Sequence, residues 1–388
     1  MSLKLKMMRI GIEAQRLFRQ HKHGMDRVAM ELIKNLQVLD KENEYFIFVK
    51  PDEDNKVISN TENFNIVEVQ GGFYPFWEQF KLPKLAKAYN CDLLHCTSNT
   101  APINLQIPLI TTLHDLIFKE DSVINQLTSG RSWYQKLGNL YRRLIVNNVV
   151  KKSKQLITVS NFEKQNIANT YNLNSSKITA IHNGVNKNFN SEIRDCQKEK
   201  IKLKYRLPDN FLLHIGSTDP RKNTARVLKV FYKYVNTCSE DIKLVLVGLN
   251  EAKLNTVLKE IGLGNELKDK LVLTGYVEDQ DLPVIYNLSE MFLFPSLREG
   301  FGIPIIEAMA CGVPVITSNT SAMPEVAAGA ACLVDPTNTD CIYIAIEKIR
   351  SDDAYKKLLI QKGFKRYKSF SWENAAKKVL EIYKQFNN

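Results

Sequence analysis

The most constraining feature of this sequence is a regular alternation of short apolar segments with longer amphipathic ones. Apolar segments occur at 8–12, 45–49, 66–69, 93–96, 109–113, 156–160 and 178–181, and a second series follows at 211–215, 243–247, 271–273, 291–294, 313–317 and 331–334. Helical patterns lie between many of them, for example at 26–39 and 224–235. Strands that are apolar on both faces and alternate with helices are typical of parallel sheets covered on both sides. The pattern predicts an α/β fold.

The two series are separated by a polar, charged segment at 186–206. A chain of 388 residues also exceeds what one hydrophobic core usually holds. We therefore expect two α/β domains, 1–190 and 205–371, joined by a linker. Ligands of such sheets bind beyond the carboxyl ends of the strands, so the loops there and the cleft between the domains are where chemistry is expected.

The formal net charge of +11 favours an acidic partner, and part of this charge is concentrated at 131–154. That segment contains seven basic residues and no acidic residue, and its apolar residues recur at helical spacing. Two interpretations stay open: a basic amphipathic helix on an anionic membrane, or a helix with a solvated basic face and an apolar face in the core. No helix-turn-helix, zinc-finger or RNA-binding signature occurs, so nucleic acid is not expected as a partner.

Compartment and redox state follow from two further patterns. No segment has the roughly 20 apolar residues needed to span a bilayer, and the N-terminal residues lack a signal-peptide pattern. The seven cysteines are odd in number and scattered, which favours reduced thiols. We expect a cytoplasmic protein, at most peripheral on the inner membrane face. Cys91 and Cys96 flank His95, but a structural zinc site needs four convergent ligands, so a buried strand is the better interpretation.

The loop at 216–223, Gly-Ser-Thr-Asp-Pro-Arg-Lys-Asn, follows an apolar strand and precedes a helix. Glycine permits close backbone approach, the helix N-terminus offers free N–H groups, and Arg221 and Lys222 add two cations. This combination suits a diphosphate. A solvated basic turn is the alternative.

The segment at 295–316, PSLREGFGIPIIEAMACGVPVI, places Glu299 and Glu307 on either side of seven residues. Two carboxylates there can accept hydrogen bonds from sugar hydroxyls, and the backbone N–H groups of 300–302 can face an anion. The alternative is that Glu299 caps the following helix and Glu307 lies on its exposed face.

This segment resembles the E-x7-E motif of the retaining glycosyltransferase family 4, and the match continues into 323–326 and 333–336. The loop at 216–223 is similar to that family's donor-diphosphate loop, and further similarities occur at 158–162, 183–185, 275–277 and 370–372. The resemblance implies the GT-B fold: two Rossmann-like domains facing across a cleft, with a C-terminal helix at 372–388 completing the first domain.

The resemblance also implies roles for individual residues. Arg221 and Lys222 would neutralise the departing nucleoside diphosphate. Glu299 would contact the transferred sugar, and His114, at the end of a strand, would lie near it; a core histidine bonded to a backbone carbonyl is the alternative for His114. The expected donor-binding residues are Gly24, Gly216, Asn223, Gly248, Leu249, Tyr276, Val277, Gly300, Phe301, Gly302, Ile303 and Glu307.

The sequence departs from the family in its first loop, where Asp26 replaces the second glycine after Gly24. Asp26 is either a helix cap or a group that faces the acceptor hydroxyl. Two Asp-x-Asp matches, at 52–54 and 279–281, would suit a metal-dependent transferase, but the first lies in a polar turn and helix capping explains the second. We expect no metal and no other cofactor.

The resulting expectation is a retaining hexosyltransferase that uses a nucleoside diphosphate sugar. GDP-mannose is the first choice because the motifs look most like the mannosyltransferase-like bacterial branch. UDP- or dTDP-sugar-dependent transferases, and a GT-B epimerase acting on UDP-GlcNAc, are the alternatives. The expected acceptor is a hydroxyl of a glycan or lipid-linked glycan, as in lipopolysaccharide.

Overall fold

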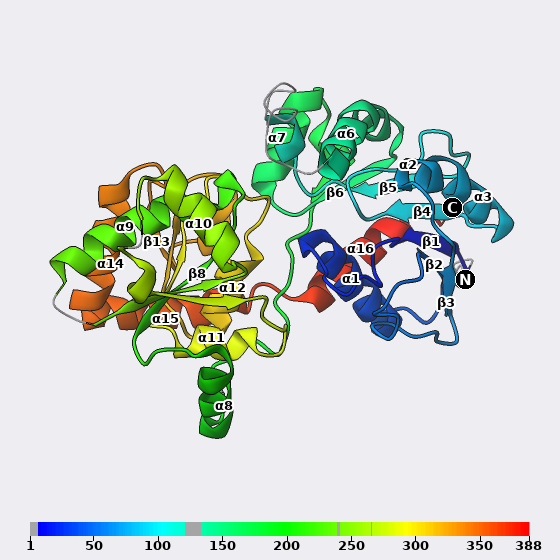
Figure 1. The fold of residues 1–388 in the computed structure, drawn as a ribbon. Helices are drawn as coiled ribbons and strands as arrows, with labels where there is room; N and C mark the ends of the chain where they lie inside the picture. The colour runs from blue at the N-terminus through cyan, green and yellow to red at the C-terminus, as the bar shows by residue number, and fades with distance from the viewer. Residues whose placement is uncertain (1–6, 121–132, 239–240, 265, 388) are drawn as a thin grey trace. The chain divides into compact units, whose positions relative to one another are not determined.

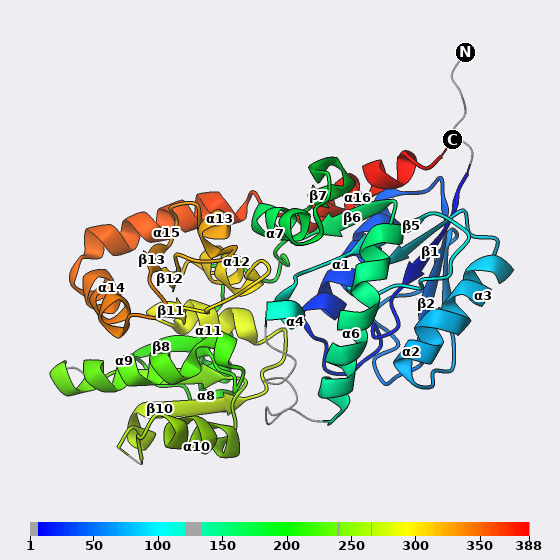
Figure 2. The same cartoon turned by 90° about the horizontal axis from the view of Figure 1, so that it is seen from above.

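The computed structural model describes residues 7–120, 133–238, 241–264 and 266–387. The chain divides into two compact units: Met1–Gly184 with Trp372–Asn388, and Val185–Ser371. In each unit the described residues form a parallel β-sheet flanked by helices (Figures 1 and 2). The apolar segments of both series are strands, within a few residues of the expected bounds.

The first unit contains a seven-stranded sheet in the order β3-β2-β1-β4-β5-β6-β7, with parallel pairing throughout. Its strands are β1 (Arg9–Glu13), β2 (Glu44–Val49), β3 (Phe64–Glu68), β4 (Leu93–Cys96), β5 (Leu109–Thr112), β6 (Gln155–Thr158) and β7 (Ile178–Ala180). Its helices are α1 (Gly24–Leu39), α2 (Tyr74–Phe76), the π-helical η1 (Trp77–Lys81), α3 (Leu82–Ala88), α4 (Ile117–Glu120), α6 (Trp133–Lys152), α7 (Asn161–Tyr171), η2 (Ser175–Lys177) and α16 (Trp372–Lys384).

Helix α16 returns to this first unit and packs against α1 (Figure 1). Its Tyr383 is fully buried, and the hydroxyl bonds to His95 Nδ1 at 2.6 Å. Helices α3 and α6 share a core cluster with β2 and β4, through Leu82, Ala86 and Val149.

The second unit contains a six-stranded sheet in the order β10-β9-β8-β11-β12-β13. Its strands are β8 (Phe211–Ile215), β9 (Lys243–Val247), β10 (Leu271–Gly275), β11 (Met291–Phe294), β12 (Val315–Ser318) and β13 (Cys332–Val334). Its helices are α8 (Asp195–Tyr205), η3 (Pro220–Lys222), α9 (Thr224–Thr237), α10 (Glu251–Glu260), η4 (Lys268–Lys270), α11 (Leu282–Leu288), α12 (Ile303–Ala310), α13 (Met323–Ala327), α14 (Thr339–Ser351) and α15 (Asp353–Tyr367). Strand β8 is central, and the order reverses between β8 and β11, which is where α/β sheets bind ligands.

The segment at 186–206 differs from the linker that we expected. It belongs to the second unit and contains α8, whose C-terminus reaches α11 through Lys204 and Tyr205. Its low apolar content concealed the helix, because only Ile201 of α8 is buried. In the described ranges, no helix has both the length and the apolar character needed to cross a bilayer.

Candidate functional site

Three glycines lie at the carboxyl ends of adjacent strands in the second unit. The Gly216 N–H donates to Val247 O at 2.8 Å, and the Gly248 N–H donates to Gly275 O at 2.8 Å. A Cβ on Gly216 would lie 2.6 Å from Leu249 Cδ1, and Gly248 has a φ of +89°. These three glycine backbones, called the glycine ledge from here on, carry no side chains, and at Gly216 the space of a Cβ is filled by Leu249.

The loop after β8 is positioned by a chain of buried polar groups that begins at His214. The His214 ring bonds to Leu293 O through Nδ1 at 2.8 Å and to Thr224 Oγ1 through Nε2 at 3.0 Å. Thr224 Oγ1 in turn accepts from the Ser217 N–H at 3.0 Å. Full burial lowers the pKa of His214 to about 4, so the ring is neutral at physiological pH. Neither His214 nor Thr224 is recognisable as part of the site from the sequence, because His214 lies inside an apolar strand.

Arg221 and Asn223 have different surroundings within this loop. The Arg221 guanidinium bonds to Asp219 through Nε at 3.1 Å and Nη2 at 2.5 Å, and the side chain stays about one third exposed. Asn223 is buried, and its amide donates to Pro295 O and Pro336 O at 2.8 Å each. Its side chain therefore joins three loops at the carboxyl end of the sheet. These contacts show that Asn223 positions the loops.

Lys222 and Glu299 bring the two predicted donor motifs together. Lys222 Nζ lies 2.7 Å from Glu299 Oε1, and the Leu297 N–H donates to Arg221 O at 2.7 Å. Lys222 Nζ also lies 5.3 Å from the centre of the Phe294 ring. The loop at 216–223 and the E-x7-E segment therefore lie together and present both a cation and a carboxylate.

The loop that carries Glu299 is held by Ser321, which the sequence analysis did not single out. Ser321 Oγ donates to Glu299 O at 2.6 Å and accepts from the Glu299 N–H at 3.2 Å and from Arg298 Nη1 at 2.9 Å. Glu299 does not cap α12, because the N-cap residue is Gly302, with a φ of +100° that favours glycine. The cap alternative for Glu299 is therefore wrong.

Glu307 and Phe301 point into the protein rather than to its surface. Glu307 is 7% exposed and its Oε2 accepts from the Tyr286 hydroxyl at 3.3 Å, so it does not lie on an exposed helix face. Phe301 is 3% exposed, with its ring 5.5 Å from that of Phe370. Backbone contacts are what we expect from Gly300, Phe301, Gly302 and Ile303. A buried Phe301 side chain is compatible with such contacts.

The residues expected to line the base pocket follow β9 and β10. Leu249 is fully buried beneath Gly216, and Val277 is 7% exposed. Tyr276 is 57% exposed, directly after Gly275 of the glycine ledge.

In the first unit, His114 follows β5 and is 6% exposed. Its Nε2 bonds to Thr97 O at 2.9 Å and its backbone N–H donates to Asn99 Oδ1 at 2.7 Å. Because a carbonyl only accepts, Nε2 carries the proton, which leaves Nδ1 as the basic nitrogen. Burial lowers the pKa of His114, partly offset by the bond to Thr97. The carbonyl bond is the one expected of a core histidine.

Asp26 is a capping residue of α1. Its Oδ2 accepts from the His23 N–H at 3.1 Å, its Oδ1 lies 3.2 Å from Arg16 Nε, and it is 3% exposed. Gly24, the first residue of the helix, has open space where a Cβ would lie. The carboxylate of Asp26 is thus committed to Arg16 and the helix terminus.

The contacts of His95, Asp54 and Asp281 bear on the remaining sequence interpretations. Both nitrogens of His95 are bonded to hydroxyls, those of Tyr383 and Thr112, which disfavours a metal site there. Asp54 pairs with Lys22. Asp281 is the N-cap residue of α11, but its carboxylate bonds to Lys204 and Tyr205 instead of the helix, so capping by the side chain was the wrong explanation.

Helix α6 has an apolar face in the core, as the second interpretation of the basic segment at 131–154 expects, and it also carries exposed leucines. Val146, Val149 and Val150 are buried in the core, whereas Leu140 and Leu144 are 43% and 65% exposed. Arg131 lies outside the described residues.

The first unit also buries two carboxyl groups that the sequence analysis missed. Glu13, the last residue of β1, is 1% exposed, and burial raises its pKa to about 7. Glu78 on η1 is fully buried, and burial raises its pKa despite hydrogen bonds from the Thr100 and Tyr141 hydroxyls. Strand β1 has the sequence of an ordinary apolar strand, and only its last residue, Glu13, indicates a buried carboxyl group.

Two parallel-sheet units, with glycines and cations at the carboxyl ends of β8 to β11, define the GT-B class of glycosyltransferases. Residues 195–366 match the family model of the glycosyl transferases group 1, and residues 23–189 match that of glycosyltransferase family 4. The chain is 32% identical over 279 residues to O-antigen chain mannosyltransferase RfbU of Salmonella typhimurium, covering 71% of this chain and 69% of the relative. The protein belongs to the group 1 and family 4 glycosyltransferases.

Other similar proteins agree with this class. The chain is 26% identical over 380 residues to O-antigen chain mannosyltransferase B of Escherichia coli, covering 93% of this chain and 96% of the relative. The solved structure of WaaG, a glycosyltransferase involved in lipopolysaccharide biosynthesis, has a TM-score of 0.72 at 13% identity and covers 96% and 99% of the two chains. Anabaena Alr3699/HepE in complex with UDP-glucose has a TM-score of 0.73 at 16% identity, covering 97% and 100%.

Proposed function

We propose that the protein is a retaining mannosyltransferase that transfers mannose from GDP-mannose to a hydroxyl of a glycan or lipid-linked acceptor. The observation that carries the donor site is the pairing of Lys222 with Glu299, in the same unit as the glycines at the carboxyl ends of β8, β9 and β10. Mannose as the sugar is supported by the two O-antigen mannosyltransferases to which the chain is similar. Their names also support a growing polysaccharide as the acceptor.

In the proposed reaction, the bond between the anomeric carbon and the diphosphate oxygen breaks while the acceptor hydroxyl bonds to the same carbon. Arg221 and Lys222 stabilise the negative charge that develops on the diphosphate, as a divalent ion does elsewhere. We propose a metal-independent, front-face displacement, in which the leaving diphosphate takes the acceptor proton. Glu299 accepts hydrogen bonds from the transferred sugar, Glu307 from the ribose, and His114 lies on the acceptor side.

A thermal-shift panel of GDP, UDP, dTDP and ADP and their sugar conjugates, with a chelator present, tests the donor. GDP and GDP-mannose should raise Tm in the wild-type protein and raise it little in Arg221→Ala, because ligand binding to the folded state alone stabilises it. The matched control is Arg206→Ala, which removes an exposed arginine at the C-cap position of α8. A preference for UDP or dTDP would assign another donor, and a requirement for a divalent ion would contradict the metal-independent mechanism.

The stereochemistry needs a separate measurement. With a synthetic mannoside acceptor, proton NMR of the first product should show the α-anomer that GDP-mannose carries. A β-linked product would exclude retention. Conversion of a sugar nucleotide without any acceptor would instead support the epimerase alternative.

A further inference from the structure

An outward-facing aromatic surface, made by Phe73, Phe76 and Phe80, lies on α2 and η1 of the first unit. Their exposed fractions are 59%, 51% and 58%. The three rings recur at the spacing of a helix face, and those of Phe76 and Phe80 are 5.2 Å apart. A surface helix normally turns its apolar face toward the core and its charged residues to water. In this segment three phenylalanines are exposed, whereas the charged Glu78 is buried beside Trp77.

This orientation is fixed from inside the protein. Glu78 Oε1 accepts from the Tyr141 hydroxyl at 2.7 Å and from Gln79 Nε2 at 2.9 Å, and Oε2 accepts from the Thr100 hydroxyl. Trp77, beside it, is fully buried in the core formed with Leu82. Exposing these groups would lose several hydrogen bonds and a large apolar contact, so the segment cannot rotate its phenylalanines inward. The π-helical turn, a feature found often at functional sites, accommodates this arrangement.

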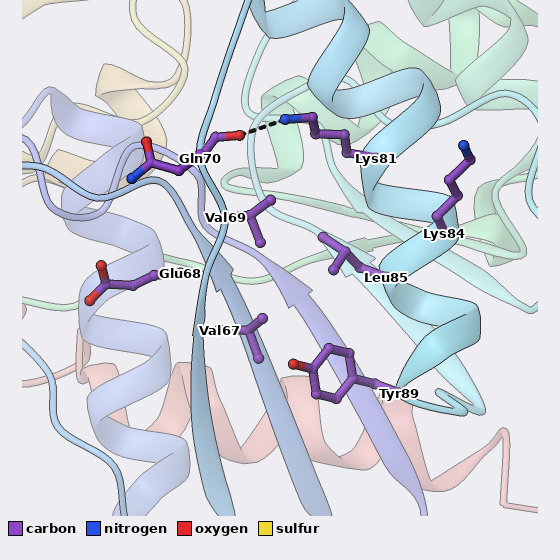
Figure 3. Close-up of a pocket in the computed structure, with 8 residues that line it drawn as sticks. All are labelled: Val67, Glu68, Val69, Gln70, Lys81, Lys84, Leu85 and Tyr89. Atoms are coloured by element: carbon purple, nitrogen blue, oxygen red, sulfur yellow. Dashed lines mark hydrogen bonds between the residues drawn. The ribbon is translucent and has the colours of Figure 1, made fainter.

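Positive charge lies directly beside the aromatic surface. Lys81 ends η1, and Lys84 and Lys87 are exposed on α3. Figure 3 shows Lys81 and Lys84 on the same flank of an open groove of about 480 Å³, whose apolar lining includes Val67, Val69 and Leu85. Lys81 Nζ bonds to Gln70 O at 2.7 Å across this groove.

Helix α6 packs against this segment through Tyr141 and carries two exposed leucines of its own. Tyr141 of α6 bonds to Glu78 and lies edge-on to Tyr74, with ring centres 6.2 Å apart. Leu140 and Leu144 flank Tyr141 and are 43% and 65% exposed. Apolar groups on two packed helical segments, with lysines next to them, form the combination that binds anionic membrane interfaces.

We propose that α2, η1 and the start of α3 form a membrane-binding surface, in which Phe73, Phe76 and Phe80 enter the acyl boundary and Lys81, Lys84 and Lys87 face anionic headgroups. Charge complementarity favours a lipid surface over a second copy of the chain, because two copies that each carry +11 repel one another. The inference rests on the proposed function only for its purpose, which is to bring the enzyme to a lipid-linked acceptor.

Vesicle flotation of the full chain tests this surface without any sugar. Wild-type protein should float with vesicles made of equal parts phosphatidylcholine and phosphatidylglycerol and should bind pure phosphatidylcholine at least about tenfold more weakly. The double variant Phe76→Ser/Phe80→Ser should lose about tenfold or more in affinity for the anionic vesicles, because two buried aromatic side chains are removed. Lys84→Glu/Lys87→Glu should lose the preference for phosphatidylglycerol.

The matched control is Leu203→Ser/Ile344→Ser, which removes two residues of the second unit that are 79% and 62% exposed. This variant should bind vesicles like wild type. A Phe80→Trp variant should also shift its fluorescence to the blue on anionic vesicles and be quenched by brominated lipids more than wild type. GDP thermal shifts on every variant report the fold and the donor site separately, so failure of the proposed function is distinguishable from failure of the membrane surface.

Three results would overturn the proposal. Wild-type protein could remain unbound with anionic vesicles, or Phe76→Ser/Phe80→Ser could float like wild type. The wild-type chain could instead be a dimer by light scattering that Phe76→Ser/Phe80→Ser converts to a monomer, which would assign the aromatic surface to self-association.

Discussion

The ammonium of Lys222 lies 2.7 Å from Glu299 Oε1, so the cation expected to bind phosphate is paired with the carboxylate expected to bind sugar. The pair is only partly accessible, with side chains that are 30% and 14% exposed. In the proposed donor complex, the diphosphate competes with Glu299 for Lys222.

Glu299→Gln should therefore separate binding from transfer. Removing the carboxylate's charge frees Lys222 and removes repulsion of the diphosphate, so GDP should bind about threefold to tenfold more tightly. Sugar transfer should nevertheless fall by about a hundredfold or more, because the proposed hydrogen bonds from the transferred sugar to the charged carboxylate are weakened. Isothermal titration with GDP and initial rates with GDP-mannose measure the two effects.

The control for this prediction is Glu278→Gln, which removes an exposed partner of Lys204 at 3.1 Å. It should change neither quantity. If Glu299→Gln bound GDP more weakly than wild type, Glu299 would not restrain Lys222 in the free enzyme.

His214 should make stability depend on pH between about 4 and 6.5. Its folded-state pKa of about 4 lies below the unfolded value of 6.5, so the unfolded chain binds more protons in this window. The contribution is fully present above pH 6.5 and is lost as the pH falls, by up to about 3 kcal/mol. In His214→Gln, urea denaturation should show lower stability at pH 7 and a flatter decline toward pH 4. An unchanged slope would show that His214 is not held neutral.

Glu13 should produce the opposite dependence. Burial raises its folded-state pKa from 4.5 to about 7, so the folded chain binds the extra proton between these values. Its contribution is present below pH 4.5 and is lost as the pH rises through 7. Glu13→Gln removes the titrating group but keeps an oxygen for the Gln15 N–H, which donates to Glu13 Oε1 at 3.0 Å. The variant should gain up to about 3 kcal/mol relative to wild type between pH 5 and 8, in the free energy of unfolding from urea titrations. An equal difference in unfolding free energy between variant and wild type at pH 5 and at pH 8 would contradict the prediction.

The sequence predicted those parts of the site whose signal is local. Strands with apolar residues on both faces, the glycine at 216 and the paired motifs around Arg221 and Glu299 are recognisable because each has its pattern within one segment. The contacts that hold them are not local: Asn223 reaches Pro295 and Pro336, which are 72 and 113 residues away. Ser321 and His214 act in the same way, through backbone atoms that any residue supplies.

The aromatic surface was missed for a different reason. Phe73, Phe76 and Phe80 read as a helix face directed to the core, and an isolated Glu78 reads as a solvated charge. Which face turns inward was decided by the partners of Glu78, Thr100 and Tyr141, which come from distant parts of the chain.

Substitution of Gly216 tests whether packing, as well as ligand binding, requires a glycine at this position. A Cβ there would lie 2.6 Å from Leu249 Cδ1 and 2.8 Å from Cγ, and Leu249 is fully buried, so it has little room to move. Gly216→Ala should therefore cost about 1–3 kcal/mol in the free energy of unfolding and weaken GDP binding. Gly138→Ala, in α6 with open space around it, should instead be neutral or stabilising by up to about 1 kcal/mol. If the clash is the cause, adding Leu249→Ala to Gly216→Ala should cost less than Leu249→Ala costs in wild type. Equal costs in the two backgrounds would show that the glycine is needed for another reason.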